Sequence, residues 1–398
     1  MPRARLLDLT RSLRRAGRVA TGVDRVEHAY LSHLLADNVP TFGLVRTAFG
    51  YALLDQSGLD EFLDRIEGNT PWGQIDLLSR LPRGRSVAQK QAESDVRRFA
   101  ISRGSRSRLT NLLADIMPDG YVYYNVGHSN LTIRVFNAVR ASGGKAAVMV
   151  HDVIPLEHPE FQRAGSVAPF REKMRRVSAH ADWVIYNSED TKQRAESYMQ
   201  EWGRVPMPIV AHLGTIVPTV NIGSLPAEVP TDQPYFVVVG TIEPRKNHAL
   251  LLDIWEEMGA DVPPLFICGG RGWNNDAVFA RLDHMTPNKN IYELPNLDDG
   301  TLAALVQGAA GMLFPSHAEG YGLPPLEALS LGTRVLCNDL QVLREILGNK
   351  AVYAPVSERY LWISTIKNWA INPPPVLESE PFIGPNWPDH FKTVLRLR

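Results

Sequence analysis

The chain has 398 residues, which is long for a single hydrophobic core and suits two domains. Hydrophobic residues make up 44% and charged residues 21%, as in ordinary globular proteins. The formal net charge of −1 lacks the strongly basic balance of many nucleic-acid-binding proteins, so we expect no nucleic-acid partner. The sequence holds no apolar run of membrane-spanning length, and its arginine-rich start lacks the apolar core of a secretion signal. We therefore expect a cytoplasmic protein.

Predicted strands and helices alternate along the chain, a pattern that favours an α/β fold with mostly parallel sheets. In the first half, the expected strands cover residues 5–9, 41–45, 121–124, 146–150 and 183–186. In the second half, they cover residues 235–239, 265–268, 290–293, 312–314, 333–337 and 352–354. Helices are expected between them, including one over residues 24–35, and residues 387–395 indicate a short final helix.

The polar, proline-rich segment 217–233 divides these two series and is the expected linker. We expect Rossmann-like domains over residues 1–216 and 234–370, facing each other across a cleft, and a segment over 371–398 that crosses back to the first domain. Ligands of open α/β sheets bind beyond the carboxyl ends of the strands, so residues that directly follow strands are the candidates for a site. The two cysteines, Cys268 and Cys337, lie in apolar runs, which predicts buried free thiols.

The most informative segment is the glycine turn of residues 317–328, where Glu319 and Glu327 flank Gly320 and Gly322. Glycines let backbone N–H groups approach a ligand, and the N-terminus of the helix that follows favours an anion. Backbone amides on a diphosphate, one carboxylate toward a sugar and the other toward a ribose would suit a nucleotide-sugar bound in one pocket. A solvated loop acid and a carboxylate that complements the helix dipole are the alternative explanations.

Further strand ends in the second half carry candidate contacts. Gly240 allows a turn, and Arg245 and Lys246 place positive charge where a diphosphate leaving group needs stabilisation; a basic pair on a surface loop is the alternative. Gly270 lies in a glycine cluster that fits either backbone approach to a nucleotide or a tight turn. The turn at Leu294 offers backbone groups that would frame a base.

In the first half, His151 and Asp152 follow a buried strand and are expected to point into the inferred cleft. His128, at the end of another strand, is a candidate contact for an acceptor. Gly22 and Arg25 open a helix after the first strand, as a loop facing a phosphate or a sugar would. A histidine at a strand end is also explained by a structural role.

Two stretches in the first half are strongly basic, residues 1–18 and residues 80–108. A solvated surface explains such runs, and so does attraction to anionic lipid headgroups or to a phosphate-bearing acceptor.

The segment 240–247, together with Glu319 and Glu327, resembles the retaining glycosyltransferases of family 4, which have the GT-B fold. Residues 21–25 and 151–155 resemble bacterial members that build surface polysaccharides. The combination of the spaced acids with the basic segment is more specific than either feature alone.

The resemblance implies roles for the matching residues. Glu319 would contact hydroxyls of the donor sugar at the reaction centre, His151 would lie beside that sugar, and Glu327 would hold the ribose. Lys246, with Arg245, would bind the diphosphate. The backbone amides of the glycine turn would bind it as well, from Gly320, Tyr321, Gly322 and Leu323.

The sequence departs from many relatives at Thr241, which stands where they have Arg directly after the strand-end glycine, and Arg245 would compensate. No Asp-x-Asp motif occurs in the sequence, so the usual ligands of a metal-bridged diphosphate are missing. We therefore expect no metal, and cationic side chains and helix dipoles would stabilise the leaving group instead.

The reaction implied by the resemblance is transfer of a hexose from a nucleotide-sugar to a saccharide or lipid-linked saccharide acceptor, with the acceptor on the N-terminal domain and the donor on the C-terminal domain. GDP-mannose is the favoured donor because residues 243–246 resemble mannosyltransferases, with UDP- or dTDP-sugars as alternatives. Front-face attack and double displacement through a protein carboxylate both remain open. A nucleotide-sugar epimerase and a catalytically silent nucleotide-sugar-binding protein are the other functions to weigh, and peripheral attachment to the inner face of the membrane is expected for a lipid-linked acceptor.

Overall fold

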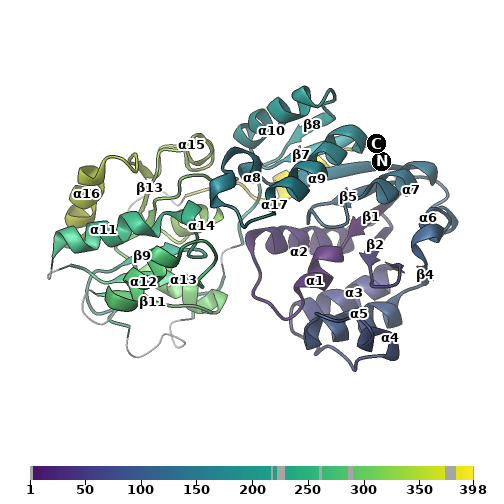
Figure 1. Cartoon of the computed structure of the whole chain (residues 1–398), viewed down its shortest axis with the longest axis horizontal. Helices are drawn as coiled ribbons and strands as arrows, with labels where there is room; N and C mark the ends of the chain where they lie inside the picture. Colours follow the sequence, from purple (N-terminus) through teal and green to yellow (C-terminus); the bar gives the residue numbers. More distant parts are fainter. Residues whose placement is uncertain are drawn as a thin grey trace.

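The computed structural model describes residues 3–216, 218–221, 229–259, 262–285, 290–372 and 382–397. They form two α/β halves that lie side by side along the long axis of the molecule (Figure 1), each built on its own sheet. Part of the expected linker, residues 217 and 222–228, and part of the closing segment, residues 373–381, lie outside the described residues.

The N-terminal half holds an eight-stranded sheet in its described residues, with the order β4-β3-β2-β1-β5-β6-β7-β8. The strands are β1 Ala4–Asp8, β2 Thr41–Arg46, β3 Tyr51–Leu54, β4 Ser102–Gly104, β5 Tyr121–Asn125, β6 Gly144–Val150, β7 Trp183–Tyr186 and β8 Met207–Val210. β3 pairs antiparallel with β2 and with β4, and the other pairs are parallel. The five strands predicted for this half are confirmed, whereas β3, β4 and β8 were not predicted.

Helices cover this sheet: α1 Thr10–Arg15, α2 Gly22–Leu35, α3 Gln56–Ile66, α4 Leu77–Arg80, α5 Val87–Phe99, α6 Leu109–Ile116, α7 Ile133–Ala141, α8 Ile154–Glu157, α9 Val167–His180 and α10 Glu189–Glu201. The start of α2 is fixed by a capping box, in which the Thr21 backbone and hydroxyl both donate to the Asp24 carboxylate at 2.7 Å. Arg11 and Arg15 pair with the same carboxylate, so they tie α1 to the first turn of α2.

The C-terminal half holds a fully parallel sheet, whose described strands follow the order β11-β10-β9-β12-β13-β14. The strands are β9 Phe236–Val239, β10 Leu265–Cys268, β11 Ile291–Glu293, β12 Gly311–Phe314, β13 Val335–Cys337 and β14 Val352–Tyr353. The helices are α11 His248–Met258, α12 Asp276–Met285, α13 Asp299–Gly308, α14 Leu323–Ser330, α15 Gln341–Leu347 and α16 Arg359–Ile371. All six predicted strands are present, and the two cysteines are buried and free, as predicted.

The chain returns to the N-terminal half at its end, where α17 Trp387–Val394 packs against α2 (Figure 1). The Tyr30 hydroxyl and His390 Nε2 form a hydrogen bond of 2.8 Å, and the Phe391 ring stacks on His33 with centroids 3.8 Å apart. The outgoing and returning segments touch at Gly214, where an added Cβ would lie only 2.3 Å from the Trp387 nitrogen. Glycine is therefore required at the point where the two passages meet.

Candidate active site

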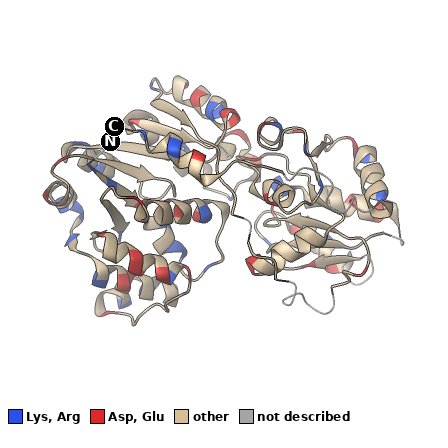
Figure 2. Ribbon diagram, turned by 180° about the vertical axis from the view of Figure 1, so that it is seen from behind, with Lys and Arg blue, Asp and Glu red and all other residues tan. Residues whose placement is uncertain are grey.

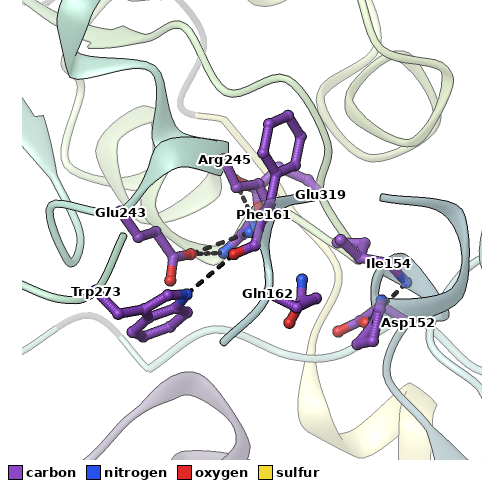
Figure 3. Close-up of a pocket in the computed structure, with 10 residues that line it drawn as sticks. Asp152, Ile154, Phe161, Gln162, Glu243, Arg245, Trp273 and Glu319 are labelled. Atoms are coloured by element: carbon purple, nitrogen blue, oxygen red, sulfur yellow. Dashed lines mark hydrogen bonds and ion pairs between the residues drawn. The ribbon is translucent and has the colours of Figure 1, made fainter. Parts of the chain in front are cut away.

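A cavity of about 220 Å³ lies between the two halves (Figure 3), at the carboxyl ends of strands from both sheets. The N-terminal half contributes residues that follow β6, and the C-terminal half contributes residues that follow β9, β10 and β12. This is the edge at which open α/β sheets bind ligands. The lining residues are Asp152, Ile154, Pro155, Phe161 and Gln162 from the first half, and Glu243, Arg245, Trp273, Glu319 and Gly320 from the second.

Glu319 is a buried carboxylate held by two cations. Its Oε1 accepts a hydrogen bond from Lys246 Nζ at 2.7 Å and lies 2.9 Å from the nearest guanidinium nitrogen of Arg245. Burial alone would raise the pKa of Glu319, but these two positive charges outweigh it and hold the pKa at about 2. The group is therefore an anion at any physiological pH and is fixed in one orientation.

Arg245 and Lys246 lie on a short 3-10 turn, Pro244–Lys246, that follows β9. Arg245 also donates to the Ala318 carbonyl at 2.7 Å and to Glu243 at 2.7 Å, so it joins the β9 turn to the β12 turn. Burial lowers the pKa of Lys246, and the adjacent Glu319 opposes that shift. The strand-end Gly240 has φ +139° and an added Cβ there would lie 3.3 Å from the Lys246 side chain, so glycine makes room for the ammonium stem.

The glycine turn after β12 brings the two halves together. A Cβ added at Gly320 would lie 2.4 Å from the His151 carbonyl oxygen. Only glycine therefore lets the turn after β12 approach the end of β6 this closely. Gly322 has φ +99° and is the N-cap of α14, whose first turn carries Pro324. The Thr191 hydroxyl donates to the Gly320 carbonyl at 3.0 Å across the interface.

Glu327 lines different cavities from Glu319, which corrects the prediction that the two glutamates face one pocket. Glu327 is the fifth residue of α14, and its side chain borders cavities shared with Arg25, Pro218 and Asp299, on the far side of the glycine turn from Glu319. Arg25 donates to Glu327 Oε1 at 2.9 Å. Burial and the nearby Asp299 raise the pKa of Glu327, and Arg25 partly offsets that rise.

Gly22 and Arg25 lie in the first turn of α2, as predicted, and this turn faces the second half. An added Cβ on Gly22 would lie 3.2 Å from the Leu323 side chain, so the start of α2 packs on the start of α14. Arg25 reaches both Glu327 and Asp299, the latter at 2.7 Å. The structure thus brings these residues next to the glycine turn, on the Glu327 side.

His151 and His128 are not among the residues that line the described cavities; the cavity receives Asp152 from this strand end instead. His151 Nε2 lies 2.6 Å from the Val126 carbonyl, and His128 Nε2 lies 2.7 Å from the Met149 carbonyl. Burial lowers the pKa of His151 to about 4, so the imidazole is neutral and bonded to backbone. Burial raises the pKa of Asp152, which the charge of Arg245 opposes.

The other residues predicted to contact the ligand, among them Tyr321, Thr241, Gly270 and Leu294, do not line the cavity beside Glu319. Tyr321 turns away from the cavity, and its hydroxyl donates to the Leu213 carbonyl at 2.7 Å. Thr241 is exposed beside the turn that contains Gly270, whose carbonyl accepts from the Ile242 amide at 2.9 Å. Leu294 packs against the hydrophobic core, while its amide donates to the Ile267 carbonyl at 2.9 Å.

Several lining residues were not among the predicted contacts, above all Trp273, Phe161 and Gln162. The Trp273 indole nitrogen donates to the Phe161 carbonyl at 3.0 Å (Figure 3). The Phe161 ring stacks on His317 with centroids 5.6 Å apart. Trp273 follows the glycine cluster after β10, a position that marks it as a strand-end residue. Phe161 ends a short 3-10 helix, Pro159–Phe161, and Gln162 follows it, without any sequence pattern that would single them out. An aromatic wall beside carboxylates and an amide suits a sugar, which presents both apolar faces and hydroxyls.

Two further hydrogen bonds join the halves. The Glu345 carboxylate of α15 accepts from the first two amides of α10, those of Glu189 at 2.7 Å and Asp190 at 3.0 Å. A carboxylate at a helix N-terminus is favourable, so one half caps a helix of the other.

The comparisons with known proteins agree with this architecture. The chain superimposes on Alr3699/HepE of Anabaena in complex with UDP-glucose with a TM-score of 0.60, at 13% identity and over 92% of this chain and 89% of the other. It matches a sucrose-phosphate synthase of Thermosynechococcus elongatus with a TM-score of 0.50, at 16% identity and over 68% and 71% of the two chains. Together with the two facing α/β halves, these likenesses show a GT-B fold.

The similarities in sequence are to glycosyltransferases, and among these to mannosyltransferases. Residues 226–360 match the family model of glycosyl transferases group 1. The chain is 34% identical over 235 residues to the serotype-specific mannosyltransferase WbdA of Escherichia coli, across 54% of this chain but only 29% of that relative. It is 25% identical over 225 residues to the O-antigen chain mannosyltransferase RfbU of Salmonella typhimurium, across 56% and 60% of the two chains.

The described helices include none that is long and apolar enough to cross a bilayer. In the same part of the chain, His, Cys, Asp and Glu side chains nowhere gather in the groups of three or more that could hold a metal ion.

Proposed function

We propose that this protein is a retaining glycosyltransferase of family 4 that moves a hexose, with mannose favoured, from a nucleotide-sugar to a saccharide or lipid-linked saccharide acceptor in polysaccharide biosynthesis. The observation that carries the proposal is the buried Glu319, held at 2.7 Å and 2.9 Å by Lys246 and Arg245 at the cavity between two GT-B halves. The match to glycosyl transferases group 1 and the O-antigen mannosyltransferase relatives support the reaction class.

The donor would extend along the glycine turn from one glutamate to the other. In this arrangement the hexose occupies the cavity beside Glu319 and Trp273, and the diphosphate lies over the amides of residues 320–323. The ribose lies near Glu327 at the start of α14. Two separate cavities on either side of one glycine turn fit a donor whose sugar and nucleoside ends differ, with the diphosphate between them.

The cations would serve the leaving group. Arg245 and Lys246 are bound to Glu319, and a diphosphate would share them as the sugar–oxygen bond breaks. Because these charges and the α14 N-terminus already supply positive potential, we propose that the reaction needs no metal. Activity that survives complete chelation with EDTA is the expected result, and its abolition would refute this part.

The acceptor would enter from the N-terminal half, past Asp152, Phe161 and Gln162. Asp152 carries a carboxyl with a raised pKa close to the proposed sugar position, where it would orient an acceptor hydroxyl. Retention then requires attack from the face of the leaving group or a covalent glycosyl carboxylate. A lipid-linked acceptor would place the protein at the inner face of the membrane.

The decisive experiment is a transfer assay with radiolabelled GDP-mannose, UDP-glucose and a dTDP-sugar, each with and without an oligosaccharide acceptor. We expect acceptor-dependent release of nucleoside diphosphate and an α-linked product from an α-linked donor. Donor isomerisation without acceptor would identify an epimerase. Nucleotide binding without turnover by any of the three donors would identify a silent binding protein.

A further inference from the structure

A second surface lies on the side of the N-terminal half that faces away from the C-terminal half, where α4 packs on α5 (Figure 1). Large apolar side chains are exposed here in one short stretch: Leu77 at 76%, Leu78 at 44%, Leu81 at 65% and Val87 at 66%. Single exposed leucines are normal, whereas a group of them marks a contact surface. We call these four residues the α4 patch.

In α4 the polar side faces the protein and the apolar side faces solvent, the reverse of a helix that packs on a hydrophobic core. Its polar residue Ser79 is buried and accepts a hydrogen bond from the Ser94 hydroxyl of α5 at 2.9 Å. Its leucines point outward. An amphipathic element with the apolar side toward solvent has no folding advantage, so the exposed leucines need another explanation.

In the described region around α4 and α5, the acidic side chains are in ion pairs, while several basic side chains are not. Acidic and basic residues both occur on its helices (Figure 2), but the acids are turned inward into ion pairs. Glu93 and Asp95 are buried, and Asp76 accepts two hydrogen bonds from Arg97, at 2.6 Å and 2.7 Å. The cations left without an ion-pair partner among the described residues are Arg80, Arg83 and Lys90. The outward charge next to the α4 patch is therefore positive.

A hollow of about 440 Å³ opens between two of these cations, Arg80 and Lys90. It is lined by Arg80 and Lys90, by the amides Gln74 and Gln91, and by Ile75. Two positive charges and two amide donors around one hollow suit a phosphate group, whose oxygens accept several charge-assisted hydrogen bonds. Because Arg80 adjoins Leu81 in the chain, the hollow and the apolar rim belong to one surface.

We propose that this surface docks on an anionic phospholipid bilayer, with the α4 patch entering the boundary between headgroups and acyl chains and a lipid phosphate occupying the hollow. The combination of exposed leucines with unpaired cations is what an interfacial membrane anchor requires, since neither contribution alone gives stable attachment. The inference rests on the proposed function in one respect: a lipid-linked acceptor gives membrane attachment its purpose.

The test is flotation of the full-length protein with vesicles of phosphatidylcholine alone or mixed with phosphatidylglycerol. We expect binding to the anionic vesicles only, weakened by salt. The double variants Leu77→Ser/Leu81→Ser and Arg80→Glu/Lys90→Glu are each expected to weaken it about ten-fold or more. Tyr360→Ser/Lys367→Glu on α16 changes an exposed ring and an exposed cation on the other half and should bind like the unmodified protein.

Patch variants that bind as well as the unmodified protein would overturn the inference, as would absence of binding by the unmodified protein. If only the Leu77→Ser/Leu81→Ser variant still bound anionic vesicles like the unmodified protein, the α4 patch would not enter the bilayer. Transfer to a water-soluble acceptor separates the two proposals, because the patch variants should keep that activity. A protein without transferase activity whose vesicle binding still depends on the α4 patch would refute the proposed function and leave this inference standing.

Discussion

Arg25 and Glu327 are 302 positions apart in the sequence, and their side chains form an ion pair of 2.9 Å that joins the start of α2 to α14. The Glu327 carboxylate, for which we propose a ribose contact, is therefore already bound to a residue of the other half. A second bond from Arg25 to Asp299, at 2.7 Å, fixes the guanidinium in this place. A bound nucleoside must replace Arg25 at Glu327 or share the carboxylate with it.

Arg25→Ala is expected to strengthen binding of GDP, because the ribose no longer competes for Glu327. Partly exposed ion pairs contribute up to about 1 kcal/mol, so the dissociation constant should fall by about two- to five-fold. Calorimetric titration measures this directly. Arg359→Ala, which removes an exposed arginine paired with Asp253 on the far side of the second sheet, should leave the constant unchanged. Weaker binding by Arg25→Ala would mean that Arg25 itself contacts the nucleotide.

Glu319→Gln is expected to reduce turnover by about 10²–10³-fold with little change in fold, because the amide keeps the volume and loses the negative charge beside the reacting sugar. Glu319→Ala should also lower the free energy of unfolding by about 3 kcal/mol, since Lys246 would be left as a buried cation without its partner and Arg245 would keep only Glu243. Steady-state kinetics and urea unfolding check the two effects separately. Unchanged turnover in a folded Glu319→Gln protein would rule out our placement of this residue.

Lys246→Met is expected to weaken donor binding by about 1–3 kcal/mol, the range for a charge-assisted hydrogen bond. The same change removes a cation that holds the pKa of Glu319 at about 2, so that pKa should rise. The acid limb of the pH profile of kcat should then move to higher pH. Lys192→Met offers a matched control, because Lys192 pairs with Glu189 at the surface. A donor affinity equal to that of the control would contradict a diphosphate contact.

Glu27 predicts a pH dependence of stability. Burial raises its pKa to about 8, and its Oε2 atom has no hydrogen-bond partner among the described residues. The folded protein therefore keeps a proton that the unfolded chain releases near pH 4, so this contribution is complete below about pH 4 and is lost as pH rises toward 8, by about 1.4 kcal/mol per pH unit. Glu27→Gln should remove that slope.

Urea unfolding at about pH 5 and pH 7.5 measures the difference. The stabilisation by Glu27→Gln relative to the unmodified protein should be larger at the higher pH. Glu358→Gln, which changes an exposed carboxylate, is the control. Equal differences at the two pH values would show that Glu27 is ionised in the folded state.

Hydrophobic runs made the parallel strands predictable, because strands buried on both faces read as continuous apolar segments. β4 and β8 lack that signal: β4 is a polar edge strand of three residues, and β8 contains Pro208 and is partly exposed at the other edge. β3 is buried, but its four residues run directly into the start of α3. Each of the three is too short or too polar to show a period of its own.

The positions of Glu319, Arg245 and Lys246 near one another followed from the rule that strand ends share one edge of a sheet. The separation of Glu319 from Glu327 did not, because it depends on the side of α14 from which each side chain leaves. Partners such as Arg25 or Phe161 come from the other half of the chain, and the angle at which two domains meet leaves no mark in a single sequence.

The contact between Gly214 and Trp387 has a mechanical consequence. The polypeptide passes between the halves twice, and the two passages touch where no side chain fits between them. Because the two connections meet at this point, we expect the halves to move relative to each other mainly by rotation about it, rather than by sliding or twisting. Release of product would then require rotation of the two halves about this contact, and α17 would move together with the N-terminal half.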